Sequence, residues 1–120
     1  MSSEEKIKFL TQIFNIPRER IFDSRSVSFR SGILDATNGR GVDLVLNSLA
    51  GELLHASWDC VAPMGKMIEI GKRDMLEHGK LEMVHFANNR SFFGVDLSEM
   101  LDDCPELVRG YAHLWTQYAE

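Results

Sequence analysis

Apolar residues in the first third of the chain recur at the spacing of a helix. The residues that set this period near the amino terminus are Ile7, Leu10, Ile13 and Phe14. They predict an amphipathic helix that ends where Asn15 and Pro17 interrupt the period. A second, shorter helix is predicted over residues 26–38, because Asn38 and Gly39 form a usual helix stop.

Three later apolar runs are short and nearly continuous, which is typical of strands buried on both faces. They cover residues 42–46, 67–70 and 92–95. Between the first two runs, the apolar face of another helix is marked by Leu53, Leu54, Ser57, Trp58 and Val61. Pro63 and Gly65 are expected to stop that helix.

The rest of the chain predicts a loop and a final helix. Leu81, Met83 and Phe86 suggest one turn of helix inside a loop over residues 72–89. Pro105 suits a first helical turn and is followed by a broad apolar stripe. Buried strands that alternate with helices imply an α/β fold, in which helices flank both faces of a parallel, Rossmann-like sheet.

Composition and charge narrow the class of protein. The 18 acidic residues outnumber the 13 basic ones, a balance that disfavours nucleic acid as a partner. The absence of a long apolar run and of a basic, then apolar, leader favours a cytoplasmic protein without a membrane partner. Cys60 and Cys104 are isolated, and the four histidines are scattered, so we expect neither a disulfide nor a metal site.

Candidate ligand-binding residues follow the first two predicted strands, because ligands of open parallel sheets bind beyond the carboxyl ends of the strands. Asn47 and Ser48 leave the first strand, and Gly71 and Lys72 leave the second. Each pair has an ordinary structural alternative. Asn47 and Ser48 would cap the next helix, and residues 71–74 would form a solvated loop.

Longer motifs resemble a known family. Residues 39–49 (GRGVDLVLNSL), Gly51 with Glu52, and residues 67–74 (MIEIGKRD) closely resemble the enoyl reductase domains of highly reducing polyketide synthases and animal-type fatty acid synthases. Residues 95–97 (VDL) and the upstream residues 3–6 (SEEK) keep the same order. These domains form a zinc-free branch of the medium-chain dehydrogenase/reductase superfamily, and the likeness covers nearly the whole chain.

The resemblance implies a nicotinamide cofactor, NADPH. Ser3 and Lys6 are similar to the serine and lysine that bind the adenosine 2'-phosphate, a role suited to a hydroxyl and a cation. Asn47, Ser48 and Leu49 resemble the segment beside the nicotinamide-ribose half of the cofactor. Gly71 resembles the glycine whose backbone lies beside the nicotinamide ring.

The resemblance also implies catalytic groups. Lys72 matches a lysine proposed in the family as proton donor or enolate stabiliser, and Asp96 falls in the region of a candidate acid. The implied reaction transfers hydride to the β-carbon of an α,β-unsaturated acyl thioester, which an acyl carrier protein presents during polyketide or fatty acid chain elongation. Negative charge gathers on the thioester oxygen, and a proton then reaches the α-carbon.

The family's first two strands and its glycine-rich phosphate turn have no counterpart in residues 1–120. We therefore expect a partial NADPH-binding domain that is inactive by itself and assembles as a homodimer or larger species through the last strand, near residues 91–95. Two alternatives stay open. One is a cofactor-free scaffold or interaction module, and the other is a segment of a quinone or alkenal reductase from the same superfamily.

Overall fold

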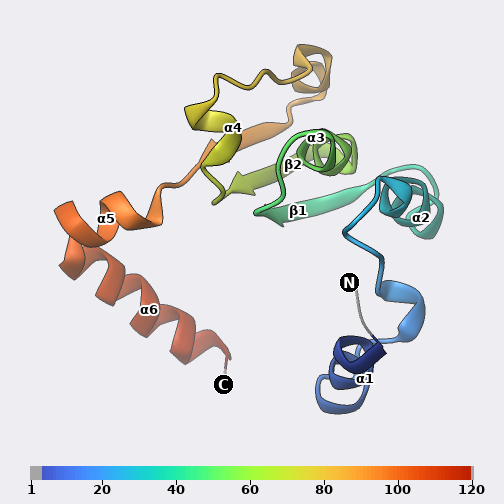
Figure 1. Ribbon diagram of the computed structural model, residues 1–120, viewed down its shortest axis with the longest axis horizontal. Helices are drawn as coiled ribbons and strands as arrows, with labels where there is room; N and C mark the ends of the chain where they lie inside the picture. Colours follow the sequence, from blue (N-terminus) through green and yellow to red (C-terminus); the bar gives the residue numbers. More distant parts are fainter. Residues whose placement is uncertain (1–3, 120) are drawn as a thin grey trace.

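The computed structural model describes residues 4–119, which hold a three-stranded parallel sheet (Figure 1). Its strands, in spatial order, are β1 (Val42–Asn47), β2 (Val61–Glu69) and β3 (Ser91–Gly94). Asn47 pairs with Glu69, and Glu69 pairs with Gly94, so the three carboxyl ends meet at one edge. The predicted α/β class and the parallel direction of the strands are confirmed.

Helices and turns lie before, between and after the strands along the chain. They are α1 (Glu4–Ile13), α2 (Ser28–Ala36), α3 (Glu52–Asp59), α4 (Arg73–Leu76), α5 (Leu97–Asp103) and α6 (Pro105–Ala119), with 3-10 turns η1 (Arg18–Arg20) and η2 (Met83–Asn88). The predicted first and second helices, the helical turns within residues 72–89 and the final helix are confirmed. The sequence reading missed α5.

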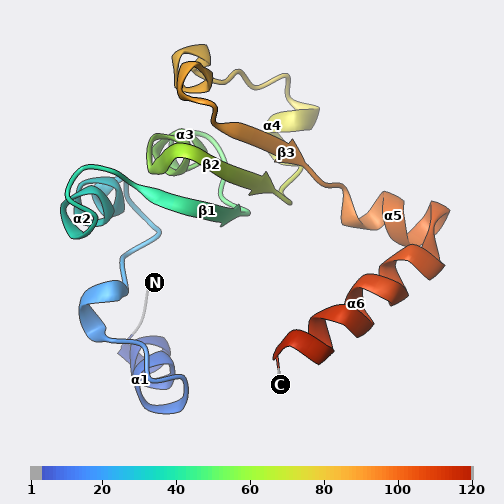
Figure 2. The same ribbon diagram turned by 180° about the vertical axis from the view of Figure 1, so that it is seen from behind.

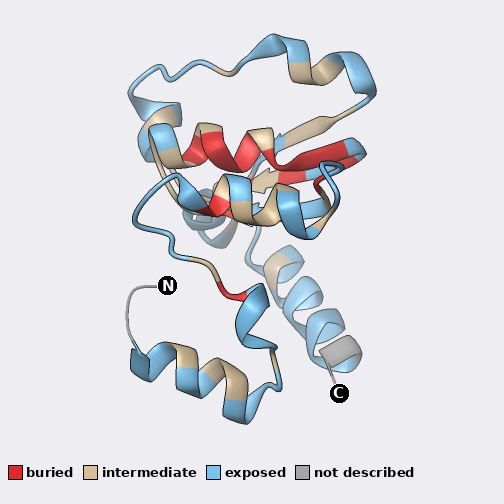
Figure 3. Cartoon of the chain, turned by 90° about the vertical axis from the view of Figure 1, so that its right-hand side faces the viewer, coloured by how far each residue is buried: buried red, intermediate tan, exposed pale blue. Residues whose placement is uncertain are grey.

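The core lies under α3, which covers one face of the sheet (Figure 3). Trp58 of α3 is 1% exposed and packs with Leu54, Val61 and Met67. Its indole Nε1 donates to the carbonyl of Glu82 at 3.1 Å, which satisfies the one polar group that the ring buries. A second cluster joins α2 to α3 rather than to the sheet, through Phe29, Ala56 and Cys60.

The opposite face of β1 is open, so the expectation of burial on both faces is wrong for this strand. It is also wrong for β3, whose Phe93 is 47% exposed. Val45 points into the core, but its neighbours Leu44 and Leu46 are 62% and 69% exposed. The reason is the placement of the helices, since α1 and α6 both lie away from the sheet in both views (Figures 1 and 2). Within residues 4–119 the outer edge of β1 also pairs with no strand.

β2 is longer than predicted and contains Pro63 and Gly65, which were expected to stop a helix. Helix α3 ends earlier, at Asp59. The pairing jumps from Val42 with Val61 to Leu44 with Lys66, so the extra residues of β2 form a bulge. A bulge tolerates a proline because its residues leave the hydrogen-bonded ladder.

Candidate functional site at the carboxyl edge of the sheet

Asn47 ends β1 and fixes the turn that follows it. Its side chain is buried, and Nδ2 donates to the carbonyl of Leu49 at 2.9 Å while Oδ1 accepts from the Leu49 amide at 3.2 Å. Ser57 of α3 donates to the same Oδ1 at 3.4 Å. These contacts hold residues 47–49 in one conformation at the edge of the sheet.

Asn47 and Ser48 do not cap α3, which was the structural alternative. The N-cap residue is Gly51, with φ 62°, which has no side chain to cap the helix. The backbone amide of Gly51 instead donates to Oδ2 of Asp74 at 2.9 Å. Asp74 therefore joins the residues after β2 to the start of α3. Residues 71–74 are thus tied to the fold and do not form the solvated loop that was the alternative.

Glu69, the last residue of β2, is a site residue that the sequence reading missed. It is 2% exposed, and both of its carboxylate oxygens accept hydrogen bonds. Oε2 accepts from Nδ2 of Asn47 at 2.5 Å, and Oε1 accepts from the amide of Gly71 at 2.6 Å. One signal was present, because an acid between Ile68 and Ile70 interrupts an otherwise apolar strand.

Gly71 follows β2 in a crowded place. A Cβ atom there would lie 2.7 Å from Oε1 of Glu69 and 3.1 Å from the carbonyl oxygen of Ser48. A side chain at this position would therefore displace the Glu69 carboxylate or crowd the Ser48 carbonyl. Gly71 lines a cavity of about 60 Å³ together with Ser48, Leu49 and Lys72, so the structure brings these predicted residues together.

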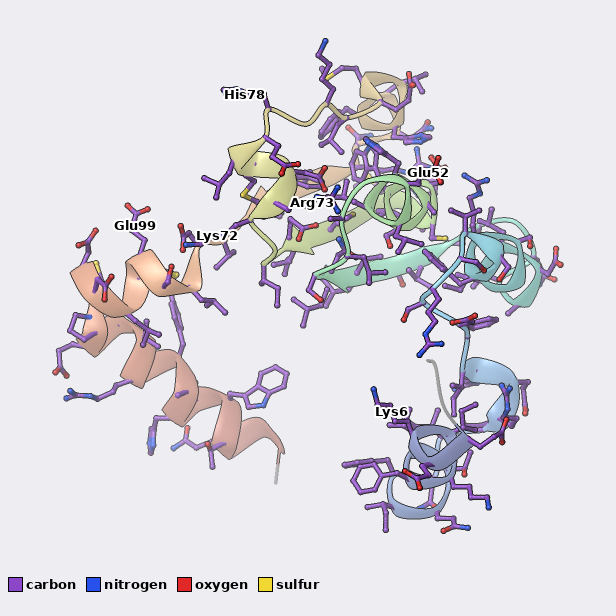
Figure 4. All side chains as sticks on the ribbon, in the orientation of Figure 1. Lys6, Glu52, Lys72, Arg73, His78 and Glu99 are labelled. Carbon is purple, nitrogen blue, oxygen red and sulfur yellow. The ribbon has the colours of Figure 1, made fainter. Side chains whose placement is uncertain are left out.

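Lys72, which follows β2 (Figure 4), forms an ion pair with Asp96, which follows β3. Nζ of Lys72 lies 2.9 Å from Oδ1 of Asp96 and donates to Oγ of Ser98 at 2.5 Å. Ser98 in turn donates to Oδ1 of Asp96 at 2.8 Å. The hydrogen bond from Lys72, supported by the amide of Glu99 and by Ser98, lowers the pKa of Asp96 from 3.8 to about 2.

Ser98 was also missed by the sequence reading. Asp96 is the N-cap of α5 and accepts from the amide of Glu99 at 3.1 Å. The residues DLSE therefore have the capping spacing of a helix start, which would have revealed α5 and placed Ser98 in its first turn. The cap orients Asp96, and Asp96 with Ser98 orients the Lys72 ammonium group.

The two residues predicted to bind the 2'-phosphate are separate from this site. Ser3 lies outside the described residues. Lys6 lies on α1, well away from Lys72 (Figure 4). Such a separation is compatible with the two ends of an extended dinucleotide.

A wider groove lies on the β1 side of residues 47–49. Its volume is about 440 Å³, and its walls include Phe22, Ser24 and Leu46. Pockets of roughly 300–1,000 Å³ are usual for small molecules and cofactors. The groove and the smaller cavity share Ser48 and Leu49 as a common wall, so the two hollows adjoin each other along the carboxyl edge of the sheet.

Comparison with known proteins decides the family. A sequence model of the zinc-binding dehydrogenases matches residues 18–117. The chain belongs to this family. The described residues 4–119 contain no group of three or more His, Cys, Asp or Glu side chains placed to hold a metal ion.

The similar proteins confirm the predicted resemblance to enoyl reductases of the medium-chain superfamily. A highly reducing polyketide synthase of Gibberella moniliformis is 59% identical over 98 residues, which are 82% of this chain and 4% of that protein. The squalestatin hexaketide synthase of Cochliobolus lunatus is 51% identical over 109 residues, 91% of this chain and 4% of that protein. The chain thus spans a small part of these relatives.

Solved structures agree. The nucleotide-binding subdomain of the enoylreductase domain of PpsC from Mycobacterium tuberculosis has a TM-score of 0.79 and 36% identity, covering 98% of this chain and 64% of that one. A putative enoyl reductase domain of a polyketide synthase has a TM-score of 0.80 and 37% identity, covering 98% and 62%. The partial Rossmann-like fold is therefore confirmed. In the part of the chain that the structure describes, no helix is long and apolar enough to cross a bilayer.

Proposed function

We propose that this chain is the C-terminal part of the NADPH-binding domain of an enoyl reductase that works in polyketide chain elongation. The single observation that carries the proposal is the meeting of Asn47, Gly71 and Lys72 at one edge of a parallel sheet, in a family whose reductase members share this fold. Ligands of such sheets bind at this edge. The substrate class is an α,β-unsaturated acyl thioester carried by an acyl carrier protein.

The residues present fit the nicotinamide half of NADPH. Residues 47–49 form a turn that the Asn47 side chain holds in place, and Gly71 adds a backbone wall beside it. Lys6 and Ser3 are proposed to meet the 2'-phosphate. When bound, NADPH supplies the hydride that reduces the β-carbon of the substrate.

Lys72 is proposed to serve the substrate side of the reaction. Its ammonium group is half-exposed at the end of β2, where a cation stabilises negative charge on a thioester oxygen and offers a proton for the α-carbon. Asp96 and Ser98 act on Lys72 by holding Nζ in place. They are positioning residues in this scheme.

The test measures oxidation of NADPH at 340 nm with a crotonyl thioester. We expect no turnover by the 120-residue chain, and turnover by a complete reductase domain that carries this segment. Lys72→Met in that domain should lower kcat by about 100-fold, as expected for loss of a positioned acid or cation. Unchanged turnover in Lys72→Met would contradict the assigned role, and turnover by the isolated chain would contradict the partial-domain proposal.

A second candidate function, a scaffold that has kept the fold without the cofactor, is favoured by exposed apolar surface. Leu44 and Leu46 on β1 and Trp115 on α6 are 62%, 69% and 76% exposed. Titration of the chain with NADPH, followed by the fluorescence of Trp58 and Trp115, separates the two candidates. A saturable change in fluorescence supports a retained cofactor site. If neither this chain nor a complete domain that carries it shows a change, the result supports the scaffold.

A further inference from the structure

Glu69 is an acid in a place that favours an apolar side chain. It alternates with Met67 along β2, on the face that α3 covers, and Met67 is fully buried there. Burial of a carboxylate is costly unless hydrogen bonds or an opposite charge replace the lost water. Within residues 4–119, Glu69 forms no ion pair, and the nearby Lys72 is paired with Asp96.

Hydrogen bonds take the place of a counter-ion. Each oxygen of Glu69 accepts from one donor, the side-chain amide of Asn47 and the backbone amide of Gly71. This acceptor-only pattern is that of an ionised carboxylate. A glutamine at the same position would have one accepting oxygen, so its NH₂ group would face one of the two donors.

The contacts place one negative charge within the wall of the candidate cofactor site. Glu69 contacts Asn47 at the end of β1 and Gly71 after β2. It also lines the same cavity as Gly71 and Lys72. Through Asn47 it also supports the turn over residues 47–49. Glu69 thus joins two parts of the edge that belong to different strands.

We propose that Glu69 is a positioning residue of the cofactor site, whose buried charge also favours the oxidised nicotinamide ring over the reduced one. This inference rests on the proposed function. The oxidised ring carries a positive charge that the reduced ring lacks, and a fixed negative charge in a low-dielectric wall stabilises charge that develops beside it. Glu69 therefore assists hydride donation without touching the substrate.

The test measures the dissociation constants of NADP⁺ and NADPH for a complete reductase domain that carries this segment, before and after Glu69→Gln. We expect the ratio of the NADP⁺ constant to the NADPH constant to rise about tenfold, because loss of the charge weakens binding of the cationic form more. Glu106→Gln is the matched control. It removes the same charge from an exposed side chain on α6, and the ratio should stay unchanged.

Equal weakening of both forms by Glu69→Gln would overturn the proposed preference for the oxidised ring while leaving the proposed function intact. An unmodified domain that binds neither form would overturn both. A second measurement does not depend on the variant folding. The carboxyl carbon of Glu69, followed by NMR in the unmodified domain, should shift differently with NADP⁺ than with NADPH, and an identical shift with both would count against the inference.

Discussion

At the scale of single residues, the ion pair between Lys72 and Asp96 couples two loops at the carboxyl edge. The hydrogen bond from Lys72 is the largest cause of the lowered pKa of Asp96. An acid with a lower pKa in the folded chain stabilises the fold above its ordinary pKa of 3.8. That contribution is lost as the pH falls through about 2.

Lys72→Met should therefore move the titration of Asp96 upward, from about 2 toward 3.8. NMR of the Asp96 carboxyl carbon against pH measures this directly. Ser98→Ala is the comparison variant and should move the midpoint less, because Ser98 contributes less to the lowered pKa than Lys72 does. Equal midpoints in the unmodified chain and Lys72→Met would show that the contact does not form in solution.

The two cysteines should differ sharply in reactivity. Cys60 is 1% exposed, and burial, with help from the Asp59 carboxylate, raises its pKa from 9.0 to about 11. Cys104 is exposed. A thiol-specific disulfide reagent at pH 8 should label Cys104 quickly. It should label Cys60 only after denaturant is added, because the thiolate is the reacting form. In Cys104→Ser the fast phase should vanish, and a fast phase that remains would contradict the buried position of Cys60.

The sequence predicted where the site lies but not its internal contacts. Asn47 and Gly71 were expected at one edge because parallel strands bring their carboxyl ends together, and this is confirmed. The bond between Asn47 and Glu69 was not predicted, because it spans 22 residues and depends on strand register. The roles of Lys72 and Asp96 stay predictions, although the structure places the two side chains in contact.

At the scale of elements, the entry into β1 depends on a tight approach to the end of α3. Gly41 has φ 93°, and a Cβ atom there would lie 2.4 Å from the carbonyl oxygen of Cys60. That carbonyl accepts from the amide of Val42 at 2.8 Å, which begins the pairing of β1 with the chain before β2. A side chain at position 41 would separate these two segments.

Gly41→Ala should lower the free energy of unfolding by about 1–3 kcal/mol, because it adds both backbone strain and a clash with backbone atoms. Urea denaturation measures the change. Gly110→Ala on α6 is the matched control, since a Cβ atom there meets nothing, and it should raise stability by up to about 1 kcal/mol through helix propensity. A Gly41→Ala chain as stable as the unmodified one would contradict the close approach of Gly41 to the Cys60 carbonyl.

Hydrophobic periodicity predicted most elements because helices and strands bury different faces. It failed at β2, where Pro63 and Gly65 sit in a bulge that only the pairing with β1 reveals. It also failed at α5, a short helix whose Leu97 and Leu101 stay exposed. A helix that buries no side chain leaves little periodic signal, and its capping residues are then the better guide.

At the scale of the whole molecule, the described chain carries apolar surface on two sides. The outer edge of β1 and the stripe of Leu107, Tyr111 and Trp115 on α6 face solvent, and β3 forms the other edge of the sheet. Edges and patches of this kind favour association with another chain. The predicted dimer through β3 stays a prediction.

Sedimentation at tens of micromolar should show a dimer or larger species. Phe93→Lys should shift the distribution toward monomer if β3 forms the contact between the copies. Phe93 of β3 is 47% exposed, and a lysine there would bring two like charges together across that contact. Leu44→Lys on β1 is the comparison variant, which should have the smaller effect. A stable monomer of the unmodified chain would rule out this assembly.

The central claim is that the carboxyl ends of β1 and β2 form the nicotinamide side of a cofactor site. The most direct test is NMR of a complete reductase domain in which residues 1–120 alone are labelled with ¹⁵N, titrated with NADPH. We predict that the largest shifts fall on the amides of residues 47–49 and 71–72, with smaller ones on β3. Saturable binding that leaves these amides unshifted would contradict the claim.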